Sequence, residues 1–479
     1  MSSREESVMH KLKAGLGSIL CLSLLVLIGF GQSGQEPATP QNSEANQEDA
    51  PAGAPSENII EQEAELAGRT IRFGPVEPLR AYLNTNTIAL RETPDENAPI
   101  VARLEGGEFE AAEVLETKGD FVRIRLSKND DAQADVPHRD RAYEAWTTWD
   151  AIVPDMTALV LDAETGAVVA RVPLTDGLSS VIFSPDGSKA MFFNGGGGIG
   201  SVAYEVRTSD YKFTRALSST EGAQFGTLFY GPADESLYAR VYGTNSTLMR
   251  IGGDGLENTP IAIPADMIVS PDGRIGFFAH EQEGGELPVD VIDLATLQLR
   301  NSFTLSGENV PSGINSFVLN KDGSELYVKL GQDSGPISVI DTWTGQPLRV
   351  LANPAKSDWS YFSQGDLVGN SLIVRTGDEG NDEMPVKPRN YWVSDGRIKR
   401  ADPAIEFAVE AGDKRFAVNG EGTRLFRLDS NNRIQERFKI HRPERGTDRE
   451  TGNALTVFGL SSSPDGKQII MFVGIEHGC

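Results

Sequence analysis

The chain has 479 residues and a formal net charge of −25, which argues against phosphate backbones and anionic membrane surfaces as partners, because both attract basic faces. Glycine is abundant, at 50 residues, and 39% of the residues are hydrophobic. This composition is typical of a turn-rich all-β protein with enough chain to bury a large core.

Residues 1–31 predict a secretory leader, since Lys11 and Lys13 precede an apolar run over residues 16–30. Glycines occupy the −3 and −1 positions of a cut after Gly31. The alternative is an uncleaved membrane anchor, although the run is shorter than the roughly 20 residues that span a bilayer comfortably. We therefore expect an exported protein, periplasmic or extracellular. It would touch the membrane only through residues 16–30, if the leader is retained.

Residues 32–68 predict a disordered acidic linker. The segment is rich in Ala, Pro, Gln, Asn and Ser and contains no Lys or Arg. Its acids are Glu36, Glu44, Glu48, Asp49, Glu57, Glu61, Glu63 and Glu65. Such a segment cannot bury enough apolar surface to offset its ordering entropy. We interpret it as a flexible spacer, and an acidic docking tail is the alternative.

Residues 69–153 predict a small β domain of short strands. Residues 121–126 alternate with period 2, the pattern of a half-buried strand. Trp146 and Trp149 lie near the end of the domain. We interpret Trp146 as a core residue that closes the domain, and the alternative is that the two rings offer a stacking surface to a ligand.

The small domain resembles the bacterial SH3 (SH3b) family between Tyr82 and Ile152. The resemblance rests on these features: the Ile88–Arg91 strand with Pro94 behind it, Leu104–Gly107, the Phe121–Leu126 strand and Trp146. It implies an SH3-like barrel. Members of the family often bind cell-wall peptides or neighbouring proteins, so the resemblance implies such a partner here.

Residues 154–479 carry an internal repeat that predicts a seven-bladed β-propeller. Its strongest mark is a Ser-Pro-Asp-Gly or Asn-Lys-Asp-Gly turn between two apolar strands, in which Pro presets φ and Gly accepts a left-handed conformation. The four strong copies begin at Ser184, Ser270, Asn320 and Ser463, and three weaker copies lie near residues 231, 366 and 412. Their mean spacing is about 46.5 residues, close to one four-stranded blade per repeat.

Each repeat also contains a second hairpin. The clearest copies are residues 160–166, 291–296 and 339–345, and the weaker copies are residues 206–210, 251–255, 393–396 and 428–432. The segment opens on an outer hairpin near Leu159 and closes on an inner hairpin ending near Val473. We therefore expect the two ends to share one blade, which would close the ring. These turns and hairpins resemble WD40-like propellers of the YVTN and TolB kind.

No catalytic residue, metal site or cofactor is predicted, and the binding residues are left unassigned. The histidines are His10, His138, His280, His441 and His477, and none has a metal-ligand spacing, although three from separate blades could meet at the mouth of the propeller. Of the two cysteines, Cys21 lies in the leader, so Cys479 is expected to be a free thiol, with a disulfide between two chains as the alternative.

Three polar segments have alternative interpretations. Gly195–Gly200 lacks the Lys and the helix of a phosphate loop, so we interpret it as a flexible blade loop. The cluster Asp378, Glu379, Asn381, Asp382 and Glu383 is interpreted as a solvated loop, with calcium binding as the alternative. Arg433–Arg449 is locally basic and is likewise interpreted as a solvated loop, with a contact to an anion or acidic partner as the alternative.

These observations favour a non-catalytic exported binding or scaffold protein. The propeller and the SH3-like domain would engage a protein of the cell envelope or a cell-wall glycan. The alternative is a lactonase-like hydrolase, since similar seven-bladed lactonases place acids and His around a central channel; this rests on analogy of fold alone. A purely structural envelope component is the third hypothesis.

Overall fold

The computed structural model describes residues 62–475 with gaps. The gaps are residues 67–68, 75, 84–86, 106–110, 128–140, 176, 195–201, 220–223, 234, 243–246, 253–254, 263–266, 281–285, 307–316, 330–334, 355–359, 363–364, 377–388 and 441–454. The predicted leader, with Cys21, and residues 32–61 of the predicted spacer lie outside the described residues. Within that part of the chain, strands alternate with short turns, and the helical segment is a single 3-10 turn, η1 (Trp149–Ala151). No helix found there is long and apolar enough to cross a membrane.

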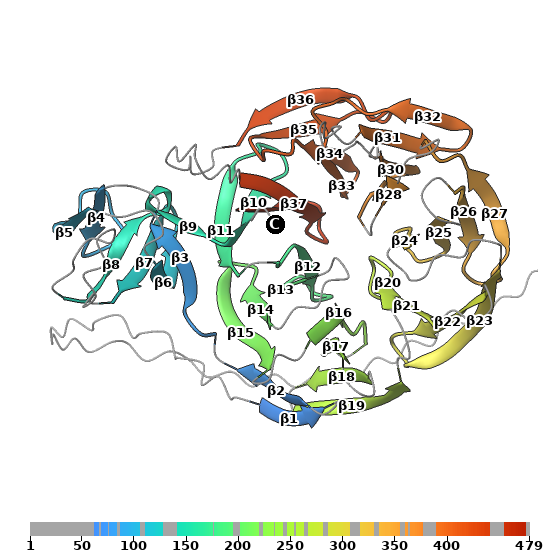
Figure 1. The fold of residues 1–479 in the computed structure, drawn as a ribbon, viewed down its shortest axis with the longest axis horizontal. Helices are drawn as coiled ribbons and strands as arrows, with labels where there is room; N and C mark the ends of the chain where they lie inside the picture. Colours follow the sequence, from blue (N-terminus) through green and yellow to red (C-terminus); the bar gives the residue numbers. More distant parts are fainter. Residues whose placement is uncertain are drawn as a thin grey trace, which may run out of the picture. The chain divides into compact units, whose positions relative to one another are not determined.

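Seven antiparallel sheets form the blades of a β-propeller around a common centre, as Figure 1 shows. Blade 1 is β12 (Ser180–Phe183), β13 (Lys189–Phe193), β14 (Val202–Arg207) and β15 (Lys212–Ser219). Blade 2 is β16 (Gln224–Tyr230), β17 (Leu237–Tyr242), β18 (Thr247–Gly252) and β19 (Gly255–Ala262). Blade 3 is β20 (Met267–Val269), β21 (Ile275–Ala279), β22 (Glu286–Asp293) and β23 (Gln298–Ser306). The prediction of an all-β fold with seven blades is confirmed.

The remaining blades follow the same order from the centre to the circumference. Blade 4 is β24 (Phe317–Leu319), β25 (Glu325–Lys329), β26 (Ile337–Asp341) and β27 (Pro347–Leu351). Blade 5 has a divided inner strand, β28 (Ser360–Tyr361) and β29 (Leu367–Val368), followed by β30 (Ser371–Thr376), β31 (Arg389–Ser394) and β32 (Arg397–Arg400). Blade 6 is β33 (Phe407–Ala411), β34 (Lys414–Val418), β35 (Arg424–Leu428) and β36 (Ile434–Lys439).

The closing blade combines the two ends of the repeat segment. Its strands run in the order β37 (Leu455–Ser462), β38 (Gln468–Ile475), β10 (Met156–Asp162) and β11 (Val168–Leu174) from the centre outward. β10 pairs with β38 in a continuous antiparallel register from Met156 opposite Gly474 to Asp162 opposite Gln468. The expected closure by a shared blade is therefore confirmed. The pairing covers the two strand edges that an open ring would leave exposed.

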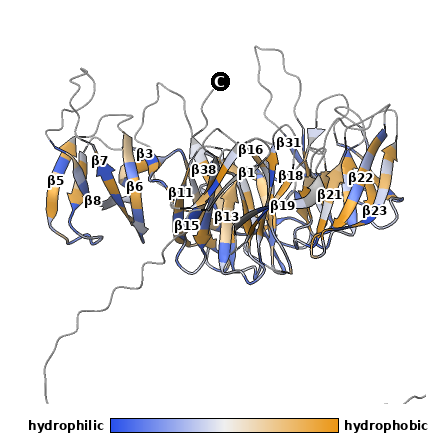
Figure 2. Cartoon of the chain, turned by 90° about the horizontal axis from the view of Figure 1, so that it is seen from below, coloured by the Kyte–Doolittle hydropathy of each residue, from blue (hydrophilic) through white to orange (hydrophobic). Residues whose placement is uncertain are grey.

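The blades pack through apolar faces that the period-2 pattern predicts. Between blades 1 and 2, for example, Met191 and Phe193 join Phe225, Leu228 and other buried side chains in one cluster. In Figure 2 the strands carry most of the hydrophobic colour, and the turns at the ends of the blades are hydrophilic. The burial of these faces is the main favourable contribution to folding.

Blade 1 is larger than the repeat predicts. A hairpin of β1 (Gln62–Leu66) and β2 (Arg69–Gly74) extends it, because β2 pairs with the outer strand β15. Ile71 and Phe73 of β2 are buried, and the guanidinium of Arg215 lies 4.3 Å from the centre of the Phe73 ring. We expected the spacer to continue to residue 68 and the small domain to begin at residue 69. The structure differs because two apolar side chains among polar ones suffice to cover one blade edge, which composition alone does not reveal.

A second β unit precedes the closing blade. It is a seven-stranded antiparallel sheet in the order β5-β4-β8-β7-β6-β3-β9. The strands are β3 (Leu79–Leu83), β4 (Thr87–Arg91), β5 (Ile100–Glu105), β6 (Ala111–Lys118), β7 (Phe121–Leu126), β8 (Tyr143–Thr148) and β9 (Ile152–Pro154). Its apolar side chains join those of the closing blade and blade 1 in one buried cluster. That this sheet is an SH3-like domain stays a prediction.

Candidate interaction surface

The Asp residues of the repeated turns hold the turns themselves. In blade 1 the Ser184 hydroxyl donates a hydrogen bond of 2.6 Å to Asp186 Oδ1, which also accepts one from the Ser188 backbone N–H at 3.0 Å. These donors lower the pKa of Asp186 to about 2. The Ser270–Asp272 and Ser463–Asp465 pairs repeat the contact at 2.6 and 2.7 Å. These three turn carboxylates are therefore already engaged by their own turns.

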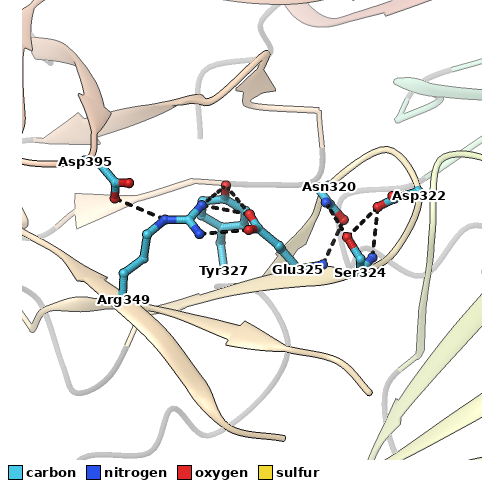
Figure 3. Close-up of polar contacts among 7 residues, drawn as sticks. All are labelled: Asn320, Asp322, Ser324, Glu325, Tyr327, Arg349 and Asp395. Carbon is cyan, nitrogen blue, oxygen red and sulfur yellow. Dashed lines mark hydrogen bonds and ion pairs between the residues drawn. The ribbon is translucent and has the colours of Figure 1, made fainter. Parts of the chain in front are cut away.

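Figure 3 shows a polar group that begins beside the Asn320–Asp322 turn of blade 4 and reaches blade 5. Arg349 of β27 donates two hydrogen bonds to Glu325 of β25, at 2.8 and 2.7 Å, and its Nε lies 3.1 Å from Asp395 of blade 5. The guanidinium holds the pKa of Glu325 below its usual range, and burial raises the pKa of Tyr327, whose hydroxyl accepts a third hydrogen bond from Arg349. The Arg349 group therefore fixes β27 to its own blade and to the next.

A second ion pair is almost fully buried. Arg375 of β30 donates a hydrogen bond of 2.6 Å to Asp366, and their side chains are 2% and 5% exposed. Arg375 also donates to the backbone oxygen of Glu406 in blade 6, at 3.2 Å, and lies 4.8 Å from the centre of the Phe407 ring. Because solvent and ligands do not reach it, this pair joins blades 5 and 6 rather than forming a site.

Only one of the five histidines lies in the described part of the chain. His280 Nε2 is 2.8 Å from Asp290 Oδ2, and the Ser302 hydroxyl donates to the other oxygen of the same carboxylate at 2.5 Å. Asp290 therefore lies between the other two groups, and the His280 ring is not in contact with the Ser302 hydroxyl in the manner of a Ser-His-Asp triad. Among the described residues, no group of three or more His, Cys, Asp or Glu could hold a metal ion.

The other polar segments named from the sequence lie mostly outside the described residues. This applies to His10, His138, His441 and His477, to Cys479, to Gly195–Gly200 and to the acid cluster at residues 378–383. Of the basic stretch from Arg433 to Arg449, the structure describes residues 433–440. There Arg437 of β36 lies 5.8 Å from the centre of the Phe426 ring, so part of this stretch packs on its own blade.

The two tryptophans of the small domain have different environments. Trp149, in η1, is 2% exposed, whereas Trp146 of β8 is only half-buried. The expected core residue was Trp146, so in this respect the two positions are exchanged. The reason is local: the 3-10 turn after β8 directs Trp149 into the cluster shared with the closing blade. A joint stacking surface of both rings does not form.

One hollow, of about 240 Å³, lies between the turns of blade 6 and the closing blade. Its charged lining residues are Asp162, Glu164, Asp413, Lys414, Asp465 and Lys467. Both lysines already form ion pairs inside it, Lys414 with Glu164 and Lys467 with Asp465 at 3.2 Å. The hollow is thus lined by groups that largely neutralise one another.

The circumference of blades 3 to 5 is different, because it exposes large apolar side chains. We call this set the rim strip; its members are Leu299, Arg300, Trp343, Leu348, Val350 and Ile398. The apolar ones are 45–63% exposed. They come from three adjacent outer strands, β23, β27 and β32, and from the turn that precedes β27 (Figure 1).

Specific contacts hold the members of the rim strip together. The guanidinium of Arg300 lies 3.3 Å from the centre of the Trp343 ring, and the Asn301 side chain donates a hydrogen bond of 2.5 Å to the Trp343 backbone oxygen. Blade 3 is thereby joined to the turn of blade 4, while the Arg349–Asp395 ion pair joins blade 4 to blade 5. These contacts therefore link the outer parts of blades 3, 4 and 5, which carry the strip.

The rim strip is also locally basic. Besides Arg300, the exposed cations Arg397, Lys399 and Arg400 lie on β32. Among the residues described, no carboxylate lies within ion-pair distance of Arg300, Arg397 or Arg400. In a chain with a net charge of −25, such a surface is an exception.

No motif in the sequence predicts the rim strip, although one signal of it is present. In the second hairpin of each repeat, the position two residues after the Asp is Glu164 in the closing blade and Ala295 in blade 3, but Trp343 in blade 4. A large aromatic residue at an exposed turn position is a mark of recognition rather than folding. The strands that lie beside Trp343 depend on the arrangement of the blades in the propeller.

Comparisons with known proteins show no family relationship. No family model matches the chain, and no curated protein matches it. Similar solved structures include a catalytically inactive virginiamycin B lyase from Staphylococcus aureus with quinupristin, at 15% identity and a TM-score of 0.38, covering 66% of this chain and 99% of that one. BamB from Moraxella catarrhalis has 12% identity and a TM-score of 0.34, covering 68% and 93%. At these values, the fold assignment depends on the strand order of this chain itself.

Proposed function

We propose that this protein is an exported, non-catalytic binding or scaffold protein of the cell envelope. Its propeller, together with an SH3-like small domain, would engage an envelope protein or a cell-wall glycan. The leader at residues 1–31 supports export, and the rim strip supports binding. The rim strip is the single observation that carries the proposal.

The residue types of the rim strip favour recognition of a protein. Interfaces concentrate aromatic residues and Arg at their centre, where they contribute most of the binding energy. Trp343 and Arg300 provide such a pair, and exposed aliphatic side chains lie on the outer strands of the same three blades. Contiguous exposed apolar residues across several elements mark interaction sites more often than isolated ones do.

Site-specific photo-crosslinking in the native cell tests the proposal. A photoreactive amino acid replaces Leu348 in the full-length chain, and the control replaces Gln435, which is exposed on the outer strand β36 of blade 6. We expect the Leu348 position to give a discrete crosslinked envelope product that the Gln435 position does not give. Equal products from both positions, or turnover of lactones by the purified full-length chain with divalent metal added, would contradict the proposal.

A further inference from the structure

We propose that the rim strip binds an extended acidic peptide segment, which adds as a fifth strand to the open edge of β27. The inference rests on the proposed binding function and names the chemistry of the partner and its mode of attachment.

The first observation is the edge itself. β27 is the outermost strand of blade 4 and pairs with β26 on its inner side, and no strand in the described part of the chain pairs with its outer side. An uncovered edge presents backbone N–H and C=O groups that can pair with another strand. Pro347 lacks an N–H and can offer an added strand only its carbonyl oxygen, so the backbone donors of this edge come from residues 348–351.

The second observation is that this protein already uses the same device. On blade 1, β2 pairs with the outer edge of β15 and buries Ile71 and Phe73 (Figure 1). A blade of this propeller therefore accepts an added strand on its circumference. The added strand is stabilised by apolar side chains that pack beside the edge.

The third observation is that side-chain contacts hold β27 in place and leave two of its apolar side chains exposed. The Arg349 group joins the strand to Glu325 and to Asp395 of blade 5, so the strand is held in place before any partner arrives (Figure 3). Leu348 and Val350 alternate with Arg349 and lie on the other face, at 49% and 63% exposed. They provide apolar contacts to alternate side chains of an added strand.

The positive charge beside β27 indicates the chemistry of the peptide that would bind there. Arg300 on one side of β27 and Arg397 and Arg400 on the other lie outside any ion pair with described residues, so acidic side chains would complement them. The net negative charge of the chain acts weakly here, because charges beyond about 8 Å are screened at physiological ionic strength. A second copy is disfavoured, since strip-to-strip pairing would bring these cations together.

Binding of designed peptides to the purified full-length chain tests the inference. The probe is a fluorescent seven-residue peptide of alternating Glu and Val, and the control peptide has Lys in place of Glu. We expect the Glu peptide to bind at least tenfold more tightly than the Lys peptide. We also expect Val350→Glu to weaken binding at least tenfold, while Val169→Glu leaves it unchanged. Val169 is the matched control, because it is 53% exposed on β11, the outer strand of the closing blade.

N-methylation separates strand addition from side-chain docking. Two further Glu-Val peptides carry N-methyl groups on one or the other alternate set of amides. Since only one set can face β27, one peptide should lose at least tenfold in affinity and the other should retain it. Equal affinity of the two N-methylated peptides, equal affinity of the Glu and Lys peptides, or dimerisation of the chain through the strip would overturn the inference.

The failure of this inference can be told apart from the failure of the proposed function. If Leu348 crosslinks an envelope partner in cells but the Glu peptide does not bind, the inference is wrong and the binding function stands. If neither occurs, both are wrong.

Discussion

At the scale of single residues, the turn carboxylates show how local chemistry recurs around the ring. Asp186, Asp322 and Asp465 occupy equivalent turns, and in each the pKa is lowered by a hydroxyl of the same turn. The donor is a serine two residues before Asp186 and Asp465 and two residues after Asp322, so each turn forms without help from distant parts of the chain. The repeats were recognisable in the sequence for the same reason.

We expect the folded-state pKa of Asp186 to depend on Ser184, since the Ser184 hydroxyl is its strongest stabiliser. The folded-state pKa of Asp186 is about 2, below the usual value near 3.9, so the ionised carboxylate stabilises the fold at pH values above about 3.9. This stabilisation is lost as the pH falls toward 2. Ser184→Ala should raise the pKa of Asp186, as measured by carboxyl NMR titration, whereas Thr304→Ala on β23 should not. An unchanged pKa in Ser184→Ala would contradict the assignment.

The Asp366–Arg375 pair of blade 5 and the Asp395–Arg349 pair between blades 5 and 4 should differ in their contribution to stability because they differ in burial. Asp366→Asn leaves the Arg375 charge buried and should lower the free energy of unfolding by about 3–5 kcal/mol. Asp395→Asn removes a partner of Arg349 that is 72% exposed and should cost about 0–1 kcal/mol. Denaturant unfolding of the two variants measures the difference, and similar losses would argue against a buried pair.

At the scale of elements, adjacent blades constrain each other's turns. The Cβ of an alanine at position 466 would lie 2.4 Å from the backbone nitrogen of Gly412 in blade 6. At Gly187, the equivalent turn of blade 1, the same Cβ would meet nothing within 4 Å. Both glycines have positive φ, +68° and +71°, so they differ only in their neighbours.

This pair of glycines makes a matched experiment. Gly187→Ala should cost about 1–2 kcal/mol, the penalty of a left-handed conformation. Gly466→Ala should cost about 1–3 kcal/mol more, because it also forces two blades apart. Thermal or denaturant unfolding measures both. Equal losses would show that the turns of blade 6 and the closing blade are not in contact in solution.

The hairpin of β1 and β2 belongs to the same scale and was not predicted. Seven four-stranded repeats were recognisable because each contains its own turn signals. The added hairpin contains a short polar sequence with Ile71 and Phe73, and its partner strand β15 lies far along the chain. Composition favours a spacer there, and only the uncovered edge of blade 1 makes a strand more stable.

At the scale of the whole molecule, the small sheet and the propeller share a core. Leu79, Val122 and Trp149 of the small unit belong to the same buried cluster as Met156 and Phe472 of the closing blade. Two ion pairs also cross between the units, Arg171 with Asp120 at 2.5 Å and Lys212 with Glu116 at 3.3 Å.

We therefore expect the small sheet and the propeller to unfold together. Calorimetry of the full-length chain should show a single transition for residues 79–475, because loss of the shared cluster exposes apolar surface on both units. Hydrogen exchange should give the strands β7 and β10 similar protection. A separate, earlier transition of the small sheet would contradict a shared core.

The all-β class, the seven repeats and the closing of the ring could be predicted from the sequence, because turns and strand alternation depend on residues a few positions apart. The pairing of β2, the burial of Trp149 rather than Trp146, and the place of Trp343, Leu348 and Ile398 on the rim strip became visible in the folded chain alone. These features depend on which distant strands become neighbours. The burial of whole blade faces decides which strands become neighbours, and no local sequence pattern encodes this.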